Sequence, residues 1–225
     1  MGSPSDDKSP MLEDVLTYYN QKLIQHGPTA RGVDWSSSDR QRLVFEQITK
    51  VCCSPRSGVR DTDFTLLDYG CGHGSLLGYL IEEDWSFRKY IGFDLLPDML
   101  EAARNLYRDH LDVTDFAGQD TLLQAADYVV ASGLITVKTK ADFSAWQGYV
   151  LETIEKMWRL ANKGIAFNSL TKYSDPPKMQ DHLYYADPCF LFDYCKTHLS
   201  RNVALLHDYG LYEFTILVRR DDCIW

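Results

Sequence analysis

The chain has 225 residues, of which 45% are hydrophobic and 24% are charged, and this is enough for one domain with a sizeable core. Its formal net charge of −9 argues against broad nucleic-acid binding, because neutralising phosphates requires a basic face. No apolar run approaches the roughly 20 residues that cross a bilayer, and residues 1–10 lack the apolar core of a secretory signal. We therefore expect a cytoplasmic protein that binds neither nucleic acid nor a membrane.

The N-terminal quarter of the chain is expected to be helical. Residues 1–10 are polar and are predicted to form a disordered tail. Apolar residues at helical spacing predict a helix over Leu12–Ile24. A second helix is predicted over Asp39–Val51, with Ser38 as its N-cap. Together, residues 11–62 would form an N-terminal helical lid that belongs to the same globular unit as the rest of the chain.

From residue 63 to 225 the pattern changes to alternating strands and helices. The predicted strands are Phe64–Asp68, Tyr90–Asp94, Val113–Gly118, Asp127–Ala131, Ile165–Leu170, Val203–His207 and Tyr212–Arg219. The predicted helices are Ser75–Glu83, Pro97–Tyr107, Trp146–Ala161 (with Lys163-Gly164 as its C-cap) and Phe190–His198. Repeated strand–helix units indicate an α/β fold with a doubly wound, mostly parallel, seven-stranded sheet. The short segment between the last two strands favours a C-terminal antiparallel hairpin.

A glycine-rich turn follows the first predicted strand. Gly70, Gly72 and Gly74 stand at alternate positions, where the absence of Cβ lets the backbone turn sharply and approach a ligand. A dinucleotide-binding fingerprint would place its third glycine at position 75, where this chain has Ser75. Asp68, just before the turn, favours a cationic ligand over a pyrophosphate. The alternative is that the glycines only close a βα turn.

The second predicted strand of this region ends in a carboxylate, Asp94. An acid at this distance from the glycine turn can bind the two hydroxyls of a ribose. The spacing fits NAD and S-adenosylmethionine equally, so Asp94 indicates a ribose without identifying the cofactor. A helix N-cap or a surface acid is the alternative interpretation.

These two motifs resemble those of the class I S-adenosylmethionine-dependent methyltransferases. The segments 66–74 and 90–104 carry the resemblance, and the order of elements from Phe64 onward also fits. The resemblance implies a Rossmann-like methyltransferase domain over residues 63–225, with S-adenosylmethionine as the methyl donor and S-adenosylhomocysteine as the product. It implies no metal, and the cysteines of this chain likewise lack the spacing of a metal site.

The resemblance also implies roles for single residues. Asp68 would hold the amino group of the cofactor, and Asp94 would hold its ribose hydroxyls. The other implied cofactor residues are Gly70, Cys71 and Gly72 beneath the methionine part, Leu95 and Met99 around the adenine, Gln119 and Asp120 at its edge, and Ser132 near the transferable methyl group.

Two segments are candidates for the acceptor site. The first is the long insertion after the fifth predicted strand, in which Tyr173, Tyr184 and Tyr185 would form walls and His182 would be a general base. The alternative is that these tyrosines pack the insertion onto the sheet and that His182 is solvated.

The second candidate segment lies between the two N-terminal helices. Arg31 would pair with the methionine carboxylate of the cofactor, and Trp35 would close the pocket. A surface arginine and a packed tryptophan are the alternatives.

The sequence therefore predicts methyl transfer to a small molecule or a short peptide in a biosynthetic pathway. A slight preference for an oxygen acceptor, either a phenol or a carboxylate, rests on the tyrosine-rich insertion. An Asn/Asp-Pro-Pro-Tyr/Phe motif, typical of many amide and base N-methyltransferases, is absent after the fourth strand. The alternatives are a small-molecule N-methyltransferase, an NAD-dependent oxidoreductase and a non-catalytic nucleoside-binding partner protein.

Overall fold

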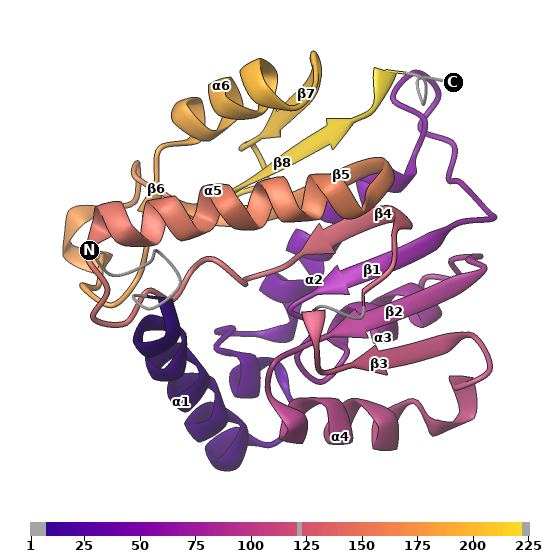
Figure 1. The fold of residues 1–225 in the computed structure, drawn as a ribbon, viewed down its shortest axis with the longest axis horizontal. Helices are drawn as coiled ribbons and strands as arrows, with labels where there is room; N and C mark the ends of the chain where they lie inside the picture. Colours follow the sequence, from indigo (N-terminus) through magenta and orange to yellow (C-terminus); the bar gives the residue numbers. More distant parts are fainter. Residues whose placement is uncertain (1–7, 121–122, 222–225) are drawn as a thin grey trace.

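A central sheet organises the structure, which is a computed structural model describing residues 8–120 and 123–221. In these residues, eight strands form one sheet in the order β3-β2-β1-β4-β5-β8-β7, with the short β6 paired to β5 (Figure 1). The pairs from β3 to β5 are parallel, whereas β8 runs antiparallel to both β5 and β7. The strands are β1 (Thr65–Tyr69), β2 (Lys89–Phe93), β3 (Thr114–Ala117), β4 (Ala126–Ala131), β5 (Ala161–Thr171), β6 (Tyr185–Ala186), β7 (Asn202–Leu206) and β8 (Glu213–Arg219).

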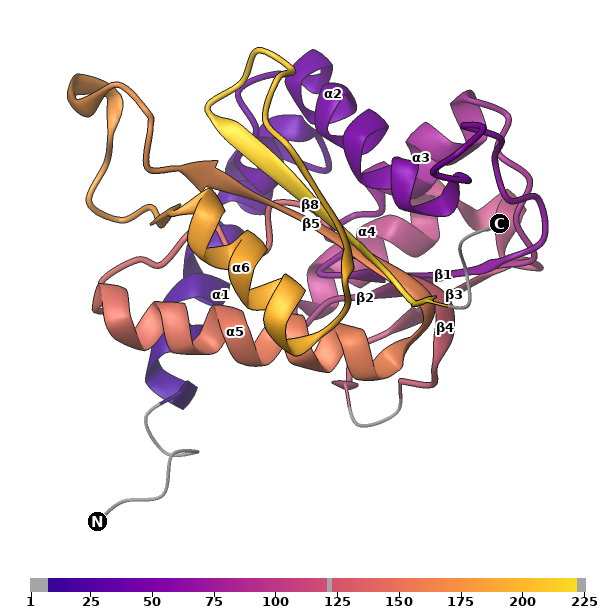
Figure 2. The same cartoon turned by 90° about the horizontal axis from the view of Figure 1, so that it is seen from above.

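Helices cover both faces of this sheet. Helices α5 and α6 lie on one face, and α2, α3 and α4 lie on the other (Figure 2). The α-helices are α1 (Lys8–His26), α2 (Ser38–Ile48), α3 (Ser75–Glu82), α4 (Pro97–Leu106), α5 (Phe143–Leu160) and α6 (Pro188–His198). Short 3-10 helices cover Ala30–Val33, Thr49–Cys52, Arg108–His110 and Pro176–Lys178. This doubly wound arrangement, with its C-terminal antiparallel pair, confirms the predicted fold class.

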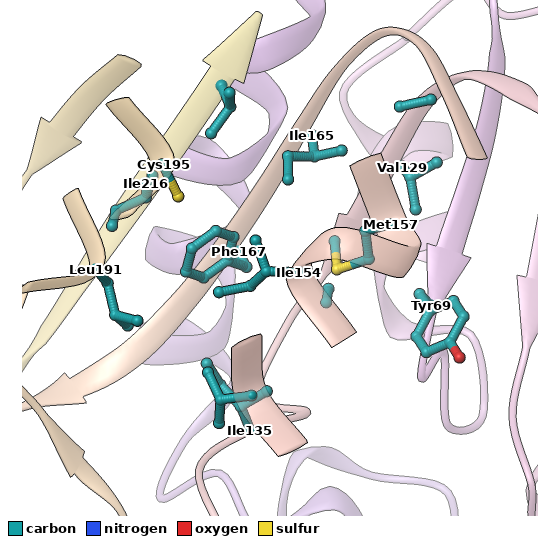
Figure 3. Close-up of a cluster of buried hydrophobic side chains, with 14 of the residues drawn as sticks. Tyr69, Val129, Ile135, Ile154, Met157, Ile165, Phe167, Leu191, Cys195 and Ile216 are labelled. Atoms are coloured by element: carbon teal, nitrogen blue, oxygen red, sulfur yellow. The ribbon is translucent and has the colours of Figure 1, made fainter. Parts of the chain in front are cut away.

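Alternating side chains of the central strands build one core on each face. In β5, Ile165 and Phe167 join the cluster beneath α5 and α6, whereas Ala166 joins the cluster beneath α2 and α3. Figure 3 shows the first cluster, in which Ile154 of α5 lies beside Phe167 of the sheet and Met157 lies toward Val129. Because both faces are covered, apolar side chains of the central strands pack on both sides of the sheet.

Three local predictions differ from the structure. The N-cap of α2 is Ser37, whose hydroxyl accepts a hydrogen bond from the backbone of Arg40 at 3.3 Å, so Ser38 is the first helical residue. Lys163 and Gly164 do not cap α5, because β5 begins immediately after the helix, at Ala161. A methyl group on Gly164 would lie 2.7 Å from the carbonyl oxygen of Val218, so strand packing requires this glycine. The third difference is β6, which the sequence analysis did not predict.

The predicted lid lies within the described residues, and the predicted tail does so only in part, because residues 1–7 fall outside them. The prediction of a disordered tail is wrong for residues 8–10, because α1 begins at Lys8. None of the helices in the described ranges is long and apolar enough to cross a membrane.

The core makes a testable prediction about stability. Phe167 is 1% exposed in the cluster beneath α5, so Phe167→Ala should lower the free energy of unfolding by about 3–5 kcal/mol, as is usual for a buried aromatic residue. Urea denaturation measures this change, with Leu111→Ala, at a side chain that is 47% exposed, as the control. A loss below about 1 kcal/mol, the range of surface substitutions, would contradict this description of the core.

Candidate cofactor and acceptor site

A cavity of about 530 Å³ opens at the carboxyl ends of β1, β2 and β4, between α1 and α5. Figure 1 shows α1 beside the ends toward which the arrows of β1 and β4 point. Ligands of doubly wound folds bind at this edge of the sheet, and the volume lies within the usual range for small-molecule sites. The cavity brings together ten of the residues predicted for the site: Trp35, Asp68, Gly70, Cys71, Gly72, Asp94, Leu95, Met99, Asp120 and Ser132.

The glycine turn after β1 is held against the end of β2. The backbone amides of Gly70 and Cys71 both donate to the carbonyl oxygen of Phe93, at 2.8 and 2.9 Å. Gly70 has φ +87°, and a methyl group on it would lie 2.7 Å from a Leu134 carbon. The glycine is therefore required both by the turn and by the cavity wall behind it.

Asp94 fixes the same turn from the other side. One carboxylate oxygen accepts from the backbone amide of Gly72 and the other from that of Leu96, each at 2.9 Å. Burial raises the pKa of Asp94, and these backbone hydrogen bonds oppose the increase. The residue at the N-cap of α4 is Leu96, so the alternative role of Asp94 as that N-cap does not apply. Each oxygen retains a lone pair for a further donor.

Asp68 is a buried carboxylate in the floor of the cavity. It is 2% exposed and accepts a hydrogen bond from the Tyr90 hydroxyl at 2.6 Å. Burial raises its pKa to about 7, although the hydrogen bond from Tyr90 opposes this increase. None of the described residues forms an ion pair with it, so the site has an unneutralised acid suited to a cationic group.

Only some of the residues that were predicted to surround the adenine line the cavity. Leu95 and Met99 line the cavity, and Leu95 is 43% exposed, which is unusual for a large apolar side chain. Asp120 also lines it, but its carboxylate forms an ion pair with Lys156 of α5. Gln119 lies outside the cavity, in a shallow surface depression beside β3. The hydroxyl of Ser132 is buried in the cavity wall, with no hydrogen-bond partner among the described residues.

The structure does not bring the tyrosine-rich insertion to the cavity. Tyr173 is 60% exposed, whereas Tyr184 is buried with its ring centroid 5.1 Å from that of Phe143. Tyr185 lies in β6, opposite Leu170, and its hydroxyl accepts from the backbone of Gln180 at 3.0 Å. The physical reason is the unpredicted pairing of β6 with β5, which folds the insertion onto the end of the sheet.

The predicted general base and the predicted partner of the cofactor carboxylate also lie outside the cavity. The ring of His182 lies 5.8 Å from that of Tyr18, and neither His182 nor Arg31 lines the cavity. Arg31 is exposed in the 3-10 helix after α1. Within the described residues, no cluster of His, Cys, Asp and Glu side chains is placed to hold a metal.

Helices α1 and α5 supply cavity residues that the sequence analysis did not assign to the site. Tyr19 of α1 is partly buried, and its hydroxyl lies 3.4 Å from the carbonyl oxygen of Gly133. Burial raises its pKa far above the usual range of a phenol. The other residues are Leu12, Val15 and Leu16 of α1 and Trp146, Tyr149, Glu152, Thr153, Glu155, Lys156 and Arg159 of α5. The apolar spacing of α1 was the available signal, since the helix turns that stripe toward the cavity.

A comparison with curated proteins found a bacterial relative. The chain is 45% identical over 157 residues to a Mycobacterium tuberculosis protein named "Putative methyltransferase Rv1506c". The match covers 70% of this chain and 93% of the relative. No protein-family model matches the chain.

Solved structures share the fold at low sequence identity. A SAM-dependent methyltransferase of Leishmania major has a TM-score of 0.62 at 14% identity and covers 98% of this chain and 87% of its own. The magnesium protoporphyrin IX methyltransferase of Synechocystis PCC 6803 with bound SAH has a TM-score of 0.54 at 15% identity, with coverages of 71% and 75%. The small RNA methyltransferase HEN1 has a TM-score of 0.57 at 17% identity, with coverages of 82% and 26%.

The sequence relative and the fold agree with the geometry of the glycine turn and its two acids. This chain belongs to the class I S-adenosylmethionine-dependent methyltransferases, and S-adenosylmethionine is its cofactor.

Proposed function

We propose that this methyltransferase acts on a small molecule or a short peptide and that the acceptor atom is an oxygen. The observation that carries the proposal is the mixed lining of the cavity. We assign the glycine turn with the acids Asp68 and Asp94 to the cofactor, as the cofactor end. We assign the apolar and aromatic walls with their neutral hydrogen-bond donors to the acceptor, as the acceptor end. The net charge of −9 supports a small acceptor over a nucleic acid, although an RNA methyltransferase shares the fold.

The acidic end fits the cofactor. The unpaired carboxylate of Asp68 would bind the amino group, and the free lone pairs of Asp94 would accept the ribose hydroxyls. The exposed Leu95 and the buried Met99 would enclose the adenine. When bound, the sulfonium supplies an electrophilic methyl group, so the protein contributes chiefly by positioning the acceptor and excluding water.

Neutral hydrogen-bond donors in the cavity lining carry the acceptor proposal. Tyr19, Trp35, Gln41 and Ser132 line the cavity with hydroxyl, indole and amide donors. A raised pKa keeps the Tyr19 phenol protonated at neutral pH, so it is a hydrogen-bond donor and a poor general base. An oxygen offers lone pairs to such donors.

The described lining residues include no histidine, so no imidazole base is placed in the cavity, although the carboxylates of Glu152 and Glu155 line it. A carboxylate or an acidic phenol is nucleophilic without an imidazole base and fits such a site. The tyrosines of the insertion, which supported the oxygen preference in the sequence, do not contribute to this argument.

The cofactor site predicts selective binding of adenosyl ligands. Calorimetric titration should give roughly micromolar dissociation constants, typical of such sites, for S-adenosylmethionine and S-adenosylhomocysteine, and no binding of NAD. Asp94→Ala should weaken both by at least about tenfold, since hydrogen bonds to a charged group contribute about 1.5–3 kcal/mol.

Asp94→Asn is the matched control, because it keeps an oxygen that accepts from the backbone of Gly72 or Leu96. An Asp94→Ala variant that is folded and binds as tightly as the wild type would contradict the ribose assignment.

The buried Asp68 predicts that cofactor affinity depends on pH. The pKa of Asp68 is about 7, so its carboxylate becomes charged as the pH rises through neutrality and then attracts the ammonium group. The affinity for S-adenosylhomocysteine should therefore increase from pH 6 to pH 8 in the wild type. It should change much less in Asp68→Asn, because the amide does not titrate. Calorimetry at both pH values measures this, and an unchanged pH dependence in the variant would contradict the assignment.

The same group predicts an opposite trend in stability. A folded-state pKa above the unfolded value of about 3.9 means that the wild type loses stability as the pH rises from about 4 to 7. Without ligand, Asp68→Asn should therefore gain stability relative to the wild type over this window, as measured by urea denaturation at pH 5 and pH 8.

The acceptor site predicts a specific effect of Tyr19→Phe. Loss of the hydroxyl should lower kcat/KM for the acceptor by about tenfold, the order of one hydrogen bond in a dry site, with the affinity for S-adenosylhomocysteine unchanged. The assay uses methyl-labelled S-adenosylmethionine with a panel of carboxylic acids, phenols and amines. Tyr18→Phe, which removes a hydroxyl that donates to Asp34, is the control. A product with the new methyl group on nitrogen or carbon would overturn the oxygen proposal.

A further inference from the structure

A hydrogen-bonded pair of side chains, the buried Asn168 and the partly buried Glu213, lies behind the cavity wall at the end of β4. Asn168 of β5 is 1% exposed, and its Oδ1 accepts from the backbone amide of Gly133 at 2.9 Å. Its Nδ2 donates to the carboxylate of Glu213 on the neighbouring β8. The two partners fix the orientation of the Asn168 amide, because Gly133 offers a donor and Glu213 offers an acceptor.

Gly133 is the point where this pair meets the cavity. It lines the cavity beside Ser132, and its positive φ of +74° marks the turn that ends the strand. Its carbonyl oxygen lies 3.4 Å from the hydroxyl of Tyr19, and the indole of Trp35 lies 3.7 Å from where a methyl group on Gly133 would stand. One short turn therefore contacts α1, the segment after it and the side-chain pair.

The surroundings of Glu213 set its ionisation. Its carboxylate faces the guanidinium of Arg40 from α2, the hydroxyl of Tyr209 from the β7–β8 connection and the amide of Asn168. Burial raises its pKa to about 7, and the hydrogen bond from Asn168 and the charge of Arg40 oppose the increase. Neither Asn168 nor Glu213 lines the cavity, so neither can contact a ligand there.

We propose that Asn168 and Glu213 are positioning residues, which act through Gly133 to hold the Ser132–Gly133 wall of the cavity in place. The proposal deepens the proposed function, because Ser132 and Gly133 line the cavity in which that function places the cofactor and the acceptor. It concerns the hydrogen bond from the Gly133 amide to Asn168, which can be measured whether or not a ligand binds.

Ionisation of Glu213 strengthens this hold. A charged acceptor forms a stronger hydrogen bond with Asn168 Nδ2 than a neutral one. That bond polarises the Asn168 amide and makes its Oδ1 a better acceptor for the Gly133 amide. The wall is therefore held more tightly as the pH rises through neutrality and more loosely below it.

The first test is the NMR signal of the Gly133 amide. In the wild type, its chemical shift should titrate with a midpoint near neutral pH. In Glu213→Gln the titration should disappear, because the isosteric amide does not ionise. Asp68→Asn is the control for the buried acid in the cavity floor, and it should leave the titration in place. Loss of the titration in Asp68→Asn, or its persistence in Glu213→Gln, would overturn the proposal.

The second test exchanges the roles of the two residues. In Asn168→Asp, two carboxylates face each other, so at pH 8 the Gly133 amide should exchange with solvent about tenfold faster, as expected when one buried hydrogen bond weakens. In the double variant Asn168→Asp with Glu213→Gln, the amide introduced on β8 can donate to the carboxylate introduced on β5, and the exchange rate should return to the wild-type value. A double variant that exchanges as fast as Asn168→Asp would overturn the proposal.

The third readout connects the pair to the ligand. The affinity for S-adenosylhomocysteine should fall severalfold in Asn168→Asp and recover in the double variant. If the wild type binds no S-adenosylhomocysteine, the proposed cofactor site fails, while the exchange and titration of Gly133 still decide the positioning role. If Gly133 behaves as expected but affinity is the same in all variants, the pair does not position the wall for the ligand, and the proposal is overturned.

Discussion

The site depends on the joint between the glycine turn after β1 and the end of β2. The Phe93 carbonyl oxygen accepts hydrogen bonds from two backbone amides of the turn, and the Asp94 carboxylate accepts a hydrogen bond from a third amide, that of Gly72. These bonds satisfy backbone donors that would otherwise point unpaired into a buried cavity. They also hold Asp68 and Asp94 at the same edge of the sheet. The chemistry of the proposed cofactor site therefore follows from the backbone geometry that these hydrogen bonds fix.

Local chemistry explains why this half of the site could be predicted from the sequence. A strand, a glycine turn and an acid at the next strand end are close in the chain, and parallel strands bring their carboxyl ends to one edge. The order and type of the elements followed from the same alternation of apolar strands and amphipathic helices. Asp68 and Asp94 therefore line the cavity as the motifs indicated, and Leu95 and Met99 line it as the family resemblance implied.

Non-local packing explains what could not be predicted. Gly164 resembled a helix C-cap in the sequence, and only its approach to Val218 on the antiparallel neighbour shows why a glycine is needed. Tyr184 and Tyr185 were consistent with a binding loop until the pairing of β6 with β5 folded that loop away from the cavity. The sequence identified Tyr19 only as one apolar position of an amphipathic helix. Its place in the cavity could not be predicted, because the direction of that helix depends on tertiary contacts.

The two halves of the cavity are therefore built on different physical principles. Backbone hydrogen bonds between adjacent parallel strands build the cofactor end, and such bonds tolerate changes in most side chains. Side chains from α1, α5 and the Gly133 turn build the part of the cavity that we propose for the acceptor, where each substitution alters shape and hydrogen bonding. This difference accounts for relatives that keep the fold at 14–17% identity while their names specify acceptors as different as a porphyrin and a small RNA. In this chain, the Gly133 turn belongs to both halves, because it ends a parallel strand and contacts the acceptor-side Tyr19. A change in the residues that hold Gly133 would alter the alignment of the two halves without removing a contact to either ligand.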